Sequence, residues 1–176
     1  KTFQDLYKAT FSQSSSPVKL NVSFQEMCVY CQNIAALFDR IMEEVYGADY
    51  TELYCYGCSW ALTKILSSRF RNIEFEVREG EFIDGHSDQR WVRAIFPDGE
   101  VFMIRATDER GVIVIEPYEQ GFVTLGLVPF CDESPDEGGM RFDHSRIDRV
   151  VHSFYLRSYD NAALLSSSPV LFSNRI

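Results

Sequence analysis

Long apolar runs and positive charge are both scarce in this sequence. The longest purely apolar run is about five residues, far short of the roughly 20 that a helix needs to cross a bilayer. Lys and Arg number 17 against 26 Asp and Glu, which gives a formal net charge of −9. The chain has no basic run that could follow a phosphate backbone. We therefore expect neither a membrane span nor a nucleic-acid partner.

Glycine and proline are also few, at 10 and 6 residues, which excludes collagen-like and low-complexity chains. Apolar residues make up 45% of the chain and charged residues 24%, a composition typical of a folded protein. The length of 176 residues suits one domain with a buried core. We expect a docking helix and linker over residues 1–17, a core over 18–165 and a flexible tail over 166–176.

Cysteine is too sparse, and odd in number, to build a disulfide framework. The chain has five cysteines, and a reducing compartment is the simpler interpretation. This favours a cytoplasmic location. The numbering begins at Lys1 with no initiator methionine, so we expect the chain to be a segment of a longer protein.

Four segments have apolar residues at helical spacing. The first is the docking helix, over residues 2–11. Ser23–Glu26 matches a capping box, and the long helix that begins there is expected to end at Gly47. A further helix fits residues 59–70. Asp143 is expected to cap a closing helix with four inward residues, Ile147, Val150, Val151 and Phe154.

After Arg71 the apolar period changes to two, which predicts strands. The runs lie at residues 73–77, 91–96, 101–107 and 112–115, with a weaker fifth run at 121–130. We expect an antiparallel β-meander with the N-terminal helices packed on it and the C-terminal helix closing it, which is an α+β domain.

The turn at Pro97–Gly99 sets the register of the second and third strands. If Asp98 and Gly99 form a two-residue turn, Pro97 faces Glu100. The same register places Asp108 opposite Gln89.

Two CxxC pairs, Cys28 with Cys31 and Cys55 with Cys58, have spacing known from zinc sites with four thiolate ligands. The first pair falls on the apolar stripe of the long helix, where a thiol serves as an ordinary core residue. We therefore interpret Cys28 and Cys31 as structural and predict no metal. A zinc-stabilised adaptor remains a third alternative for the function.

Cys58 is the candidate nucleophile because it lies at the predicted start of the helix over residues 59–70. Unpaired amides and the helix dipole stabilise a thiolate at that end, and a thiolate can attack a carbonyl carbon. The same amides, including that of Cys58 itself, would hold the oxyanion. The alternative is a buried cysteine at a helix start.

His86 is the candidate general base, because it directly precedes a predicted strand, whereas His144 and His152 lie on the closing helix. An exposed loop histidine is the alternative. Asp108 is the candidate for the acid that orients His86.

Two other acids, Asp88 and Glu109, compete with Asp108 for the role of orienting acid. A solvated turn residue is the further alternative for Asp108. A cysteine at the head of a helix, a histidine before a strand and an acid after the next strand follow the order of Cys-His-Asp enzymes.

Five segments carry a resemblance to a known family: Gly57–Leu62, Gly85–His86, Trp91–Ala94, Pro97–Gly99 and Ile104–Thr107. Together they resemble the core of the transglutaminase-like and papain-like cysteine enzyme superfamily, over residues 55–110. The resemblance implies peptide hydrolysis, acyl transfer or glutamine deamidation, without metal or cofactor. Deamidation is common among bacterial effectors that modify host proteins, which implies a protein substrate in a host cell's cytosol.

Carried over to this chain, Cys58 would be the nucleophile and His86 the general base and then acid. In the family, the strand usually has an aspartate two residues before the threonine, where this chain has Arg105. Either Asp108 takes that role, or the chain is an inactive relative. Three extra residues, Asp88–Arg90, also separate His86 from the matching strand.

A non-catalytic binding module is the main alternative to an enzyme. The net charge of −9 also suits an adaptor or an immunity protein, and the acidic segment 132–137 could steer a basic partner.

Overall fold

The computed structural model describes residues 22–85, 88–107, 109–129, 144–159 and 161. The elements, in chain order, are α2 (Val22–Tyr46), α3 (Tyr50–Leu53), α4 (Cys55–Arg69), β1 (Glu74–Phe82), β2 (Asp88–Ile95), β3 (Val101–Ala106), β4 (Ile113–Pro117), α5 (Tyr118–Leu125), β5 (Leu127–Pro129) and α6 (His144–Ser158). The predicted docking helix, the capping Asp143, the acidic segment 132–137 and the tail lie outside the described residues.

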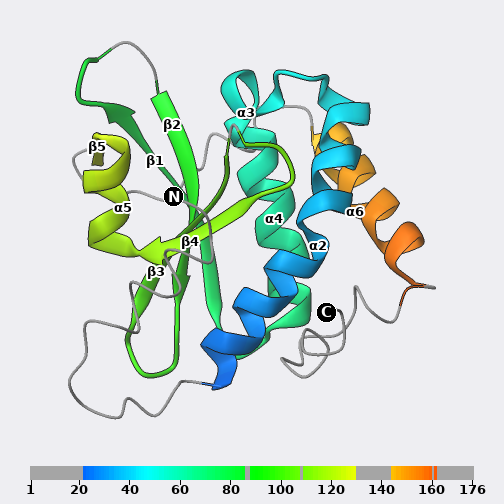
Figure 1. Cartoon of the computed structure of the whole chain (residues 1–176), viewed down its shortest axis with the longest axis horizontal. Helices are drawn as coiled ribbons and strands as arrows, with labels where there is room; N and C mark the ends of the chain where they lie inside the picture. The colour runs from blue at the N-terminus through cyan, green and yellow to red at the C-terminus, as the bar shows by residue number, and fades with distance from the viewer. Residues whose placement is uncertain (1–21, 86–87, 108, 130–143, 160, 162–176) are drawn as a thin grey trace.

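The five strands form one antiparallel sheet in the order β4-β3-β2-β1-β5. The first four strands are neighbours in chain order, which confirms the predicted meander. Helices α2, α4 and α6 lie on one face of this sheet, and α5 lies against the other (Figure 1). The predicted α+β class is therefore confirmed.

No helix of the described segments has the length and apolar character that a membrane crossing requires.

Helix α2 was predicted closely from its apolar stripe. It ends at Tyr46, and Gly47 follows with φ of +98°, a left-handed conformation that favours glycine. The Gly47 backbone N–H donates to the Glu43 carbonyl at 2.8 Å. The helix begins at Val22, so Ser23 lies inside it and is not its N-cap. The Ser23 hydroxyl oxygen accepts a hydrogen bond from the Asn72 side-chain amide at 3.2 Å.

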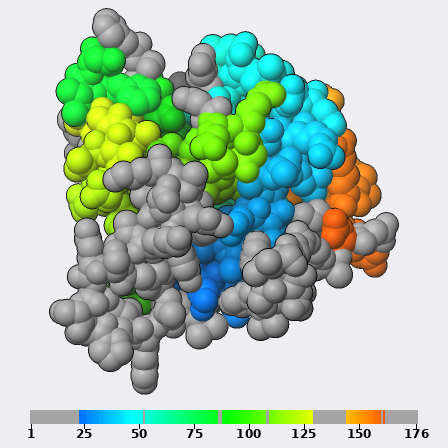
Figure 2. All heavy atoms as spheres, viewed as in Figure 1, coloured from blue at the N-terminus to red at the C-terminus, as the bar shows by residue number. Residues whose placement is uncertain are grey.

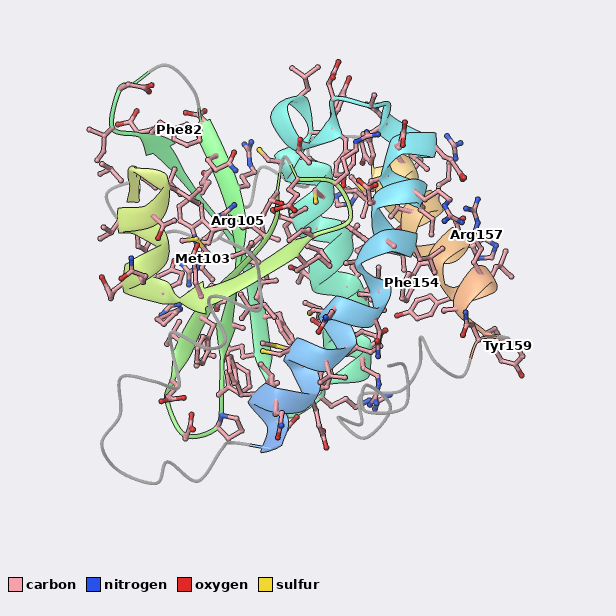
Figure 3. The ribbon with its side chains drawn as sticks, viewed as in Figure 1. Phe82, Met103, Arg105, Phe154, Arg157 and Tyr159 are labelled. Atoms are coloured by element: carbon pink, nitrogen blue, oxygen red, sulfur yellow. The ribbon has the colours of Figure 1, made fainter. Side chains whose placement is uncertain are left out.

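The predicted fifth strand, over residues 121–130, was wrong at 121–125, which form the end of α5, and was confirmed at Leu127–Pro129. The apolar side chains Tyr118, Phe122 and Leu125 recur at helical spacing, and they pack with Trp91 and Met103 on the sheet face opposite α4. Figure 3 shows Met103 on the sheet beside this helix.

Two glycines fix the position of α5. A Cβ on Gly121 would lie 2.6 Å from the Met103 sulfur, so glycine permits the close approach to β3. Gly126 ends the helix in the left-handed conformation. Strand β5, which follows, has three residues and pairs with β1, with Leu127 opposite Phe82.

Helix α6 packs as predicted, with Ile147, Val150 and Phe154 fully buried and Val151 partly buried. Its opposite side is exposed, and Tyr159, directly after the helix, points away from the domain (Figure 3). The exposed side also forms ion pairs, such as Asp148 with Lys64 at 2.9 Å. Surface pairs of this kind contribute little to stability, so the buried apolar residues hold α6 in place.

We expect Phe154→Ala to lower the free energy of unfolding by about 3–5 kcal/mol, because it removes a buried ring and leaves a cavity. Leu156→Ala, two residues along the same helix, is the matched control. The Leu156 side chain is 64% exposed, so its loss should change stability by less than about 0.5 kcal/mol. Urea unfolding followed by circular dichroism measures both, and equal effects would contradict the described packing.

Candidate functional site

Cys58 lies in the first turn of α4 and lines a small open pocket between this helix and the sheet. The pocket is lined by α3, α4 and the adjoining ends of β2 and β3, through Thr51, Cys55, Cys58, Ser59, Gln89, Arg90, Arg105 and Ala106. Figure 2 shows one face of the molecule, with α5 and β1 to one side of the β3–β4 segment and α2 and α3 to the other.

The other two predicted catalytic residues, His86 and Asp108, lie outside the described residues. Their described neighbours do reach the pocket. Gln89, three residues after His86, and Ala106, two residues before Asp108, both line it together with Cys58. The strand ends that lead to the predicted base and acid therefore meet at the predicted nucleophile.

The turn between β2 and β3 has three residues, so the predicted two-residue turn was wrong. Ile95 faces Val101, whereas a two-residue turn would pair it with Phe102. The Gly99 amide donates to the Phe96 carbonyl at 2.9 Å, and Gly99 has φ of +87°. These features are typical of a three-residue hairpin loop with a left-handed glycine. The predicted pairing of Asp108 with Gln89 does not hold in this register.

Helix α4 begins at Cys55, four residues before the predicted start. Cys58 is therefore inside the first turn, and its backbone N–H donates to the Tyr54 carbonyl at 3.1 Å. The predicted role of this amide in an oxyanion hole was wrong for this conformation, because the amide already has a partner.

Gly57, interpreted as part of a bend, is helical, and a Cβ there would lie 2.5 Å from the Tyr46 hydroxyl oxygen.

The environment of Cys58 favours the neutral thiol. Its side chain is 4% exposed, and burial raises its pKa well above the ordinary value. The charges of Cys55 and Asp39 raise this pKa further, whereas a hydrogen bond with the Ala106 backbone lowers it. The sequence predicted a lowered pKa from the helix end alone, and the structure gives the opposite direction.

Asp39 of α2 is an acid near Cys58 that the sequence analysis missed. The Tyr50 hydroxyl donates to the Asp39 Oδ1 atom at 2.6 Å, and Tyr50 is almost fully buried. Asp39 directly follows the core residue Phe38 in a helix of mixed polarity, so nothing in the sequence pattern separates it from a solvated helix residue.

Two arginines of the pocket wall were also not predicted as site residues. The Arg90 guanidinium lies over the Tyr56 ring, 5.3 Å from its centroid, and donates to Glu79 at 3.3 Å. The Arg105 Nε atom lies 3.5 Å from the Glu116 carboxylate, whose side chain is fully buried. Both arginines of the pocket wall are thus paired with carboxylates, those of Glu79 and Glu116.

Cys28 and Cys31 are core residues, as predicted, with exposed fractions of 1% and 0%. Burial raises the pKa of Cys31 to about 12. No three or more His, Cys, Asp or Glu side chains come together in a way that could hold a metal ion, within the part of the chain that the structure describes. Both CxxC pairs belong to that part, so they do not form the four-thiolate site of the zinc alternative.

No family model, curated protein or solved structure matches this chain. The fold and the site define an α+β protein with a buried cysteine on a pocket lined by two arginines.

We expect iodoacetamide to modify Cys58 slowly near neutral pH and faster as the pH rises, because burial raises the pKa of this thiol. Mass spectrometry of peptides from the reduced, folded chain measures the rate, and the chain unfolded in urea is the control. Rapid modification of Cys58 in the folded chain well below about pH 8, where a free thiol is mostly protonated, would contradict the described burial.

The free energy of unfolding should fall at alkaline pH because of the titration of the Cys31 thiol. Its pKa rises from an ordinary value of 9.0 to about 12 in the folded chain, so folding favours the protonated thiol. This contribution is complete below pH 9 and is lost as the pH rises from there toward 12. While it is being lost, the free energy of unfolding falls by about 1.4 kcal/mol per pH unit.

Cys31→Ala removes this titration, so the free energy of unfolding should fall less steeply with alkaline pH in the variant. Urea unfolding at several values above pH 9 measures the slope for both proteins. Identical slopes in the two proteins would count against the described burial of Cys31.

Proposed function

We propose that the protein is a cysteine-dependent acyl-transfer enzyme of the transglutaminase-like or papain-like type. It acts on a glutamine side chain or a peptide bond of a protein, as a deamidase, transglutaminase or protease. One observation supports this most: Cys58 lines an open pocket together with Gln89, three residues after His86, and Ala106, two residues before Asp108. The order of the three residues along the chain agrees with the resemblance.

In the proposed reaction, the Cys58 sulfur attacks the carbonyl carbon of the substrate amide. Because Cys58 is held as a thiol, a base must take its proton as the carbon–sulfur bond forms. His86 takes this proton and gives it to the nitrogen that leaves, while Asp108 orients its ring. A thioester remains on Cys58. Water or an amine then attacks the thioester, which releases the acyl group and restores the thiol.

The negative charge on the carbonyl oxygen needs a partner during this reaction, and the Cys58 amide is already bonded within the helix. The guanidinium groups of Arg90 and Arg105 are the cationic groups of the pocket wall, so we assign this stabilisation to them. Arg105 stands at the position where the family usually has an aspartate. In this proposal it serves the oxyanion, and Asp108 supplies the acid.

The resemblance to bacterial effector deamidases extends the proposal to a host protein as substrate and to a host cell's cytosol as the place of action. The second candidate is a non-catalytic binding module. The raised pKa of Cys58 and the arginine in place of the family aspartate favour it, since both are expected of a relative that has lost its activity.

We expect Cys58→Ala to abolish release of ammonia or of new amino termini from purified protein substrates, without unfolding the chain. Cys31→Ala is the matched control, because it removes a buried thiol away from the pocket. Its activity should remain close to that of the unmodified chain. His86→Ala should lower the rate by about 100-fold or more, as expected for loss of a general base.

An alanine variant at Cys58 with full activity would rule out the proposed mechanism. If the unmodified, reduced chain releases neither product from a broad set of proteins, and binds one of them without changing its mass, the binding module is favoured instead.

A further inference from the structure

Cys55 and Cys58 are two free thiols on one turn of α4, and both line the pocket. Cys55 is partly exposed, whereas Cys58 is almost fully buried. The acyl-transfer reaction proposed above uses Cys58 only, so Cys55 is a second sulfur nucleophile in the pocket without a role. Of the two residues, Cys55 is therefore the one that solvent reaches more readily.

The spacing of the pair permits a disulfide. Residues three apart on a helix have Cβ atoms about 5–6 Å apart, and a disulfide requires about 3.5–4.5 Å. The difference is small, and Cys55 is the first residue of α4, where backbone N–H groups have no partner within the helix. A modest shift of the first turn therefore brings the sulfurs together. Their proximity is also evident because charge on Cys55 raises the pKa of Cys58.

We infer that Cys55 and Cys58 form a redox-active dithiol that exchanges with low-molecular-weight disulfides. Cys55, the accessible sulfur, loses its proton and attacks one sulfur of the disulfide. A bond forms between Cys55 and that sulfur, the bond within the reagent breaks, and one thiol leaves with the proton. Cys58 then loses its proton and attacks the Cys55 sulfur. The Cys55–Cys58 disulfide forms, and the second thiol leaves with that proton.

The balance is two cysteine thiols oxidised to one disulfide and one reagent disulfide reduced to two thiols. In each step one thiolate displaces another from a disulfide sulfur, so no metal or further electron carrier takes part. The exposed and buried members have different roles: Cys55 accepts the mixed disulfide, and Cys58 resolves it.

The chain contains its own comparison, because Cys28 and Cys31 have the same spacing within a helix. They lie within α2, with exposed fractions of 1% and 0%, and neither lines the pocket. A disulfide reagent cannot reach them without unfolding. If helical spacing alone were sufficient, both pairs would oxidise. If access through the pocket decides, only Cys55 and Cys58 will.

Oxidation would also remove the Cys58 thiol that the acyl-transfer reaction needs. This consequence rests on the proposed function, but the dithiol does not. A reversible disulfide at this position would make the enzyme active only under reducing conditions.

The test is to equilibrate the folded, full chain with mixtures of glutathione and glutathione disulfide, quench with acid and map the peptides by mass spectrometry. We expect a disulfide between Cys55 and Cys58, reversed by excess glutathione, while Cys28 and Cys31 remain thiols. The inference would be overturned if no disulfide forms in either pair, or if the Cys28–Cys31 disulfide forms first. A disulfide between a pocket cysteine and Cys131, the fifth cysteine of the chain, would also overturn it.

Two variants separate the steps. Cys58→Ser should hold the glutathione adduct on Cys55, because the resolving sulfur is gone, and Cys55→Ser should form neither the adduct at this position nor the disulfide. Cys31→Ser, the matched control, should retain the Cys55–Cys58 disulfide. A Cys58→Ser chain that remains folded but forms no adduct on Cys55 would also overturn the inference. These readouts use mass alone and no protein substrate, so they can fail or succeed independently of the activity of Cys58→Ala.

Discussion

The packing of α4 against the sheet is the constraint on which the rest of the structure depends. Four of its apolar residues, Ala61, Leu62, Ile65 and Leu66, have no exposed surface. They form one broad face, and the buried Ser59 and Thr63 extend the covered surface beyond it. Helix α4 packs on β1 and β2 and has α6 against it, with α2 alongside (Figure 1). A helix covered on so much of its surface is central to the core. This burial sets the position of its first turn, and hence of both pocket cysteines, against the ends of β2 and β3.

Ion pairs within the sheet place arginines against carboxylates. The chain is acidic overall, with a formal net charge of −9, and Arg93 of β2 and Arg105 of β3 lie near the carboxylates of Glu76 and Glu116. Glu116 is nearly inaccessible, and among the described residues its carboxylate oxygens accept no hydrogen bond and have Arg105 as ion-pair partner. A buried carboxylate without a cation is costly, which explains why Arg105 is held at the end of β3, beside the pocket. The same residue therefore links the interior of the sheet to the site.

The sequence predicted the parts of this structure that follow from local periodicity. The stripes of α2 and α6 and the four-strand meander were correct because each repeats over several turns or strands. The features that depend on distant contacts were missed. Gly57 lies directly against the Tyr46 ring of α2, and residues 118–125 pack on the sheet face opposite α4. Cys58 was identified from its local motif, but its pKa shift was predicted in the wrong direction. The residues of α2 and β3 that bury it are distant in the sequence, so the local motif gives no sign of this burial.

The return of β5 to β1 has a consequence for the order in which the chain can assemble. The meander from β1 to β4 pairs strands that are adjacent along the chain, so it can form as soon as residue 117 has been synthesised. The outer edge of β1 gains its partner only when Leu127–Pro129 arrives. Until then, backbone donors and acceptors of Gly80–Phe82 are open to strands of other molecules. Nascent or truncated chains that stop before this point are thus the species most exposed to intermolecular association, and a chaperone that shields this edge would protect them during synthesis.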